Sequence, residues 1–178
     1  MASQGPLSPS VGTDVSFSGA FFNWSTPGNI TAQDNTYATD TAIGDPAAQN
    51  IVSLVKGGTV SGSNLSTGAT IPATDTDTYT SFGGTSNLWG LTLAVADVNA
   101  SNFGWVASLA HAGSITHYLQ ATGFGFTIPT GATINGVLAE VDWSGGSGTH
   151  HVDHMRLTVY YTPVGGLLLR RRKAVLGW

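Results

Sequence analysis

The sequence of 178 residues contains no cysteine and few charged side chains. Without cysteine, the chain has neither a disulfide framework nor a thiolate metal site, and its redox compartment is undetermined. Charged residues make up 9% of the chain, against about 25% in an average soluble domain. Glycine, serine, threonine and asparagine, which favour turns and strand surfaces, take their place. This balance suits a secreted or assembled all-β protein better than a cytosolic enzyme.

Long apolar runs and catalytic sequence patterns are also missing. No stretch approaches the ~18 apolar residues of a membrane-spanning helix, and the first ten residues lack the basic and apolar regions of a signal peptide. We therefore expect no membrane span and no signal peptide. The chain contains no G-x-S-x-G, Walker or His-Glu-x-x-His sequence, so we expect no enzyme activity.

Positive charge is scarce and unevenly distributed. Four of the six basic residues lie at 170–173, and the rest of the chain holds two basic and ten acidic residues, a balance of −8. We do not expect this acidic body to bind nucleic acid. Apolar residues flank the basic run, a poor composition for a solvated end. We predict that this tail docks on a partner through Leu167, Leu168, Leu169, Arg170, Arg171, Arg172, Lys173 and Trp178.

Residues 151–163 give the clearest strand pattern. Met155, Leu157 and Val159 fall on one parity and alternate with polar residues, which predicts a strand with one apolar face. Similar segments occur at 50–56, 104–109 and 134–143, separated by glycine-rich turns. We predict an all-β, antiparallel β-sandwich of the jelly-roll type with residues 151–163 as a central strand. The predicted organisation is a polar N-terminal arm at 1–13, a sandwich domain at 14–163 and an apolar-basic C-terminal tail at 164–178.

The strand at residues 50–56 is apolar on both faces. Ile51 and Val55 share one parity, and Val52 and Leu54 share the other. Such a strand is either covered on both sides or part of an interface. We predict from it a homo-oligomer, most simply a trimer.

Five histidines raise the question of a metal site. His150 and His154 share a strand face but lie about 13 Å apart by strand rise, too far for one ion without a bulge. His151 and Asp153 could approach each other only if the strand start bends, and His111 and His117 only through the tertiary fold. We therefore interpret the histidines as polar residues at strand entries and predict no metal and no other cofactor. A Ca²⁺ ion held by Asp34 or Asp153 is the alternative, without support from any EF-hand spacing.

Two other groups of side chains invite a functional interpretation. Glu140 and Asp142 are expected on one exposed strand face about 7 Å apart, within the range of inverting glycosidases, but any two acids at this spacing give the same distance. Aromatic residues could form a glycan platform, although most tryptophans in a small all-β fold are core anchors. The aromatic candidates are Trp24, Trp89, Trp105, Trp143 and Tyr79.

Several longer phrases resemble a group of small all-β structural proteins of tailed phages and prophages. They are NWSTPGN at 23–29, DNTYA at 34–38, LVKGG at 54–58, FGG at 82–84, LWG at 88–90, ADVNASNFG at 96–104, YLQATGFGFTIPTGATING at 118–136 and VDHMRLTVYYT at 152–162. The resemblance covers most of residues 20–163 and implies a virion or tail component with no catalytic residues. In the family pattern, the stretch like residues 118–141 precedes the stretch like residues 50–109, so the strand blocks are reversed here.

The expected function is that of a structural virion protein. We expect a capsid decoration (cement) protein that stabilises the head shell, with a tail or fibre component as the nearest variant. Its partners would be phage capsid or tail proteins, and it would reside in the virion after assembly in the host cytoplasm. The alternative is a carbohydrate- or receptor-binding jelly-roll module.

Overall fold

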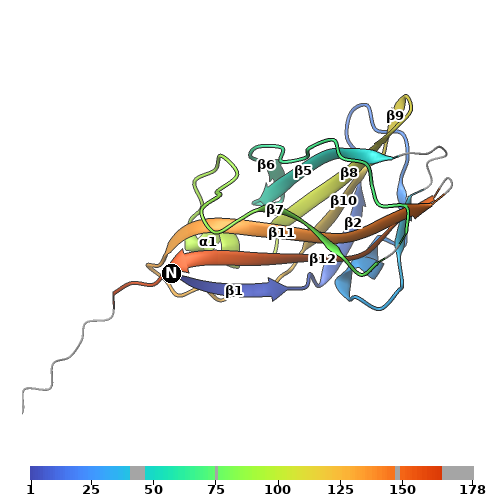
Figure 1. Ribbon diagram of the computed structural model, residues 1–178. Coiled ribbons are helices and arrows are strands. Elements are labelled where there is room, and N and C mark those ends of the chain that lie inside the picture. The colour runs from blue at the N-terminus through green and yellow to red at the C-terminus, as the bar shows by residue number, and fades with distance from the viewer. Residues whose placement is uncertain (41–46, 75, 147–148, 166–178) are drawn as a thin grey trace, which may run out of the picture.

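Two antiparallel β-sheets packed face to face make up the fold (Figure 1). The computed structural model describes residues 1–40, 47–74, 76–146 and 149–165. The predicted all-β antiparallel sandwich is confirmed, whereas the finer assignment to a jelly roll stays a prediction. The only helical segments among the described residues are the 3₁₀ helix η1 (Pro27–Thr31) and the single turn α1 (Val95–Asn99).

Each sheet has six strands. In the first sheet the order is β3-β4-β12-β11-β7, and β1 also pairs with β12. In the second sheet the order is β2-β10-β8-β5-β6, and β9 pairs with β8. The first sheet consists of β1 (Ala2–Leu7), β3 (Trp24–Ser25), β4 (Ala38–Asp40), β7 (Tyr79–Gly83), β11 (Thr133–Gly146) and β12 (Thr149–Thr162). The second consists of β2 (Val11–Val15), β5 (Ala48–Lys56), β6 (Thr59–Ser61), β8 (Gly104–His111), β9 (Ser114–Ile115) and β10 (Tyr118–Thr122).

The strand predicted at residues 151–163 is central, as expected. It is β12, which pairs with β11 on one side and with β1 and β4 on the other. Met155, Leu157 and Val159 are fully buried in the core between the sheets. The other face of β12, predicted to be polar, is less exposed than expected, because His154 and Thr158 are buried as well.

A bulge in β12 changes which face its first residues occupy. Cross-strand partners lie on the same face of a sheet, and the register between β11 and β12 shifts so that β12 contains one extra residue, Asp153. A one-residue shift turns every side chain beyond it to the other face. Val152 therefore joins the core, and His150, two residues earlier, also points into the sandwich, where it is buried.

Strand β5 is covered on both faces within one chain. Val52 and Leu54 belong to the core between the sheets, and Val55 on the other parity is also fully buried. A tight turn at Gly57 and Gly58, both with positive φ, folds the chain back into β6, as a two-residue hairpin loop requires. Three of the four apolar residues of this strand are therefore covered within one chain, and Ile51 is partly exposed.

The prediction of an N-terminal arm at residues 1–13 is wrong, because most of these residues form strands. Residues 2–7 form β1, whose Ala2 lies opposite Tyr161 and whose Leu7 packs against the core cluster. The side chain of Gln4 bonds both the backbone N–H and the hydroxyl of Thr127. Residues 11–15 form β2 along the edge of β10. Prolines and polar residues at an edge strand are compatible with one-sided pairing, which is why composition alone suggested an arm.

Removal of residues 2–7 should therefore destabilise the sandwich. The truncation exposes one edge of β12 and the face that Leu7 covers, so we expect a loss of about 2 kcal/mol, or about 4–8 °C in Tm for a chain of this length. Thermal unfolding followed by circular dichroism measures it. Leu7→Ser is the matched variant, which keeps the ladder and should lose less. An unchanged Tm after truncation would restore the arm interpretation.

Candidate functional site

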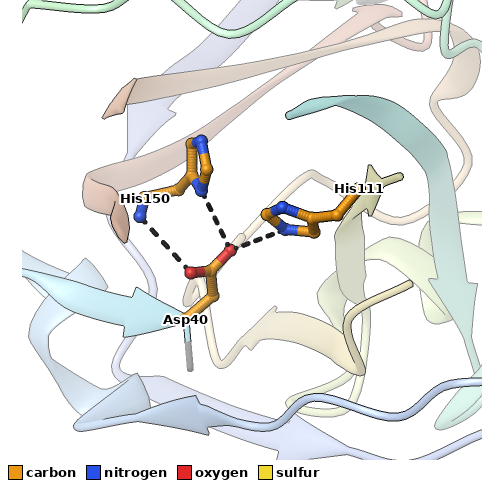
Figure 2. Close-up of side chains that lie close together, drawn as sticks. All are labelled: Asp40, His111 and His150. Carbon is orange, nitrogen blue, oxygen red and sulfur yellow. Dashed lines mark hydrogen bonds and ion pairs between the residues drawn. The ribbon is translucent and has the colours of Figure 1, made fainter. Parts of the chain in front are cut away.

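A cluster of one aspartate and two histidines lies inside one end of the sandwich. Nε2 of His111 is 3.0 Å from Oδ2 of Asp40, and Nδ1 of His150 is 3.3 Å from the same oxygen (Figure 2). The backbone N–H of His150 donates to Oδ1 of Asp40 over 3.3 Å. The two imidazole rings meet edge to face with their centroids 4.9 Å apart.

Strand alternation places two of the three side chains inward, and the β12 bulge adds the third. Asp40 follows the buried Ala38 by two residues on β4, and His111 follows the buried Leu109 by two residues on β8. His150 reaches the same interior only through the β12 bulge described above. Since β4 and β12 belong to one sheet and β8 to the other, the cluster connects the two sheets.

Solvent hardly reaches this cluster. The side chains of Asp40, His111 and His150 are 0%, 1% and 2% exposed. A buried carboxylate needs a nearby positive charge or several hydrogen bonds. The two described basic side chains are engaged elsewhere: Lys56 pairs with Asp97 and Arg156 with Glu140. Among the described residues, the Asp40 carboxylate therefore contacts the two imidazoles and the backbone N–H of His150, with no lysine or arginine beside it.

The interpretation of the histidines as polar strand-entry residues is wrong for His111 and His150, which are buried. The two histidines expected to share a face, His150 and His154, lie on opposite faces because of the bulge. His117 does not join His111 but bonds Asp14, with Nδ1 2.8 Å from Oδ2. The spacing of two residues from the apolar Ala38 and Leu109 could have predicted that Asp40 and His111 point inward. No sequence signal located the bulge.

A second group of acids lies on the outer side of the first sheet. Carboxylate oxygens of Asp77, Asp142 and Asp153 lie within 4.8 Å of one another. The side-chain amide of Gln33 donates to Asp142 over 3.1 Å and to Asp77 over 3.4 Å. Asp34, the other residue considered for Ca²⁺, is fully exposed, and hydrogen bonds from Thr36 lower its pKa. Gln33 thus bonds two of the three acids, and the backbone N–H of Asp34 donates to the third, Asp153, over 3.4 Å.

Glu140 and Asp142 do not form the exposed acid pair that was expected. Glu140 accepts two hydrogen bonds of 3.0 Å from the guanidinium of Arg156, and Asp142 is buried. The Arg156 guanidinium in turn lies 3.5 Å from the centre of the Tyr79 ring. Hydrogen bonds to Glu140 raise the pKa of Arg156. Glu140 is thus held by a fixed cation and is poorly placed to exchange a proton with a substrate.

The four tryptophans in the described part of the chain are core residues, as is usual in a small all-β fold. Trp24, Trp89, Trp105 and Trp143 are all at most 3% exposed. The indole N–H of Trp89 donates to the carbonyl of Val137 deep in the core. These four tryptophans, which were candidates for a glycan platform, therefore offer no stacking face to solvent.

The predicted partner-binding residues Leu167, Leu168, Leu169, Arg170, Arg171, Arg172, Lys173 and Trp178 lie outside the described residues. The last described residues of the chain, 162–165, are exposed where they leave β12. Figure 1 shows the N-terminus beside this exit, in agreement with the pairing of β1 and β12.

Comparisons of the chain with protein-family models, with curated proteins and with solved structures find no match. No helix in the described part of the chain is long and apolar enough to cross a membrane.

His154 should make the stability of the protein depend on pH. Burial first, and the nearby Arg156 second, lower the pKa of His154 below 6.5, so the folded state keeps this ring neutral while the unfolded chain still takes up a proton. Stability should therefore fall as the pH drops below 6.5, by at most about 1.4 kcal/mol per pH unit for one proton.

Urea unfolding at several values between about pH 8 and pH 5 measures this slope. His154→Gln, whose amide can still bond the hydroxyls of Tyr79 and Ser8, should show a smaller slope over the same range. Identical slopes in the two proteins would contradict the assignment to His154.

Proposed function

We propose that this protein is a structural subunit of a tailed-phage virion, most simply a decoration protein of the head shell, and that it is not an enzyme. The observation that carries the proposal is the division of the chain into a paired sandwich and an apolar-basic tail that begins where residues 162–165 leave it, exposed to solvent. The resemblance of residues 20–163 to phage structural proteins supports the same assignment. The protein would enter the virion after assembly in the host cytoplasm.

Charge supports a partner for the tail. The body is acidic, and both of its basic side chains are already paired within the chain. Asp34 and Asp77 remain exposed on its surface. The acidic body of a second copy, or an acidic surface of the shell, would therefore complement residues 170–173.

The same complementarity is the support for a homo-oligomer, for which we keep the trimer as the simplest state. Strand β5 supports it little, because Val52, Leu54 and Val55 are buried within one chain and Ile51 is only partly exposed. We do not propose carbohydrate binding, because the four tryptophans that could have stacked on a sugar are in the core. The guanidinium of Arg156 already lies against the ring of Tyr79, the fifth aromatic candidate.

Residues 167–178 should be needed for assembly and dispensable for folding. Burial of a leucine or tryptophan side chain contributes about 1.5–3 kcal/mol, whereas an exposed ion pair contributes about 0–1 kcal/mol. Deletion of residues 167–178 should therefore weaken or abolish assembly while leaving Tm unchanged. Replacement of only the four basic residues by serine should weaken assembly less and reduce its dependence on salt.

Light scattering and electron microscopy of the full chain and of both variants measure assembly. Recovery of the protein in purified virions, in a fixed ratio to the shell protein, tests the location. A truncated chain that assembles as well as the full chain would show that the tail is passive, and absence from purified virions would overturn the virion assignment.

A further inference from the structure

We propose that Asp40, His111 and His150 form a buried site for a divalent transition-metal ion of the Zn²⁺ class. The site would be structural: the ion would join β4 and β12 of one sheet to β8 of the other. This inference is independent of the virion assignment, because it concerns the interior of the sandwich and not the tail.

The geometry of the ligand atoms fits such an ion. Zn²⁺ binds imidazole nitrogen and carboxylate oxygen at about 2.0–2.2 Å, which places neighbouring ligand atoms of a tetrahedral site about 3.3–3.5 Å apart. The nitrogens of His111 and His150 lie 3.0 and 3.3 Å from Oδ2 of Asp40, and the three ligand atoms all lie within 4.8 Å of one another. Small side-chain movements are enough to place an ion between them.

The chemistry of the donors selects the class of ion. Two imidazoles and one carboxylate suit Zn²⁺ and similar ions, whereas Ca²⁺ and Mg²⁺ prefer oxygen donors alone. A divalent cation would also balance the buried charge of Asp40, which no described lysine or arginine does. The three side chains supply three of the four positions of a tetrahedral site, and a water molecule would take the fourth. Their burial leaves a substrate no path to the ion, which is why we propose a structural role.

Gly145 makes room for one of the ligands. It lies opposite His150 in the β11–β12 ladder, and a Cβ atom at this position would come within 2.1 Å of Cδ2 of the His150 ring. Alanine at residue 145 would therefore displace the ring without removing any ligand.

Titration of the untagged, chelator-treated full chain with Zn²⁺ and with Co²⁺ tests the proposal. We expect calorimetry to give one ion per chain and Co²⁺ to give a visible absorption band of tetrahedral intensity that Zn²⁺ abolishes. By NMR we expect Zn²⁺ to change the chemical shifts of the imidazole ¹⁵N resonances of His111 and His150. At free Zn²⁺ about 100 times the Kd, binding favours the folded state about 100-fold, which corresponds to a rise in Tm of about 5–10 °C.

Variants assign the ion to this cluster. His111→Gln and His150→Gln should each weaken Zn²⁺ binding about 100-fold or more, and Gly145→Ala at least about 10-fold, since even partners beyond the direct ligands change affinity by about 10–100-fold. His117→Gln is the matched control, because it removes a histidine from another His–Asp pair. Gly28→Ala is the control for Gly145→Ala, since a Cβ there meets no atom within 4 Å. Both controls should bind as the wild type does.

Several results would overturn the proposal. They are the absence of Zn²⁺ binding or of a Tm change in the wild type, NMR shifts at histidines other than His111 and His150, and undiminished binding by folded His111→Gln and His150→Gln variants. Loss of Zn²⁺ binding in Asp142→Asn/Asp153→Asn would also overturn it, because it would move the ion to the acidic group on the outer face. If the glutamine variants do not fold, the imidazole spectrum of the wild type decides by itself.

Discussion

The antiparallel pairing of β11 with β12 is the constraint on which the rest of the structure depends. Both strands are 14 residues long, and every other strand of the first sheet is attached directly or indirectly to their outer edges. Their alternating apolar residues, among them Val141 and Met155, supply one wall of the core. The extra residue Asp153 in this pairing turns the start of β12 over, so that a single backbone irregularity decides which side chains enter the interior at this end.

The consequence is that Val152 and His150 enter the interior, where parity with Met155 alone would have placed Asp153 and His151. Replacement of a buried ion pair by apolar residues is often neutral or stabilising, so Asp40, His111 and His150 are not needed simply to fill space. Their value lies in specific chemistry: two imidazoles and one carboxylate, from three strands, meet at one point between the sheets. Such convergence resists sliding of one sheet over the other, because each donor is fixed by the ladder of its own strand.

The proposed role in a virion and the proposed metal site concern different parts of the chain. The first depends on the tail and on the charge of the surface, and the second on the interior. A particle-bound protein benefits from a rigid body that holds its shape while a terminal segment engages a neighbour, and a clamp between the sheets would supply that rigidity.

Alternation and composition are local properties of the chain, and they were enough to predict the all-β class and the central strand at residues 151–163. They also predicted the strands around residues 50–56, 104–109 and 134–143 and the burial of most tryptophans, of which the four described ones are buried. Tertiary structure alone decided that residues 2–7 form a strand, because an edge strand owes its existence to the open edge of β12. It also decided the buried cluster. Asp40, His111 and His150 are distant in sequence, and the bulge that turns His150 inward depends on how two strands pair, which no local pattern encodes.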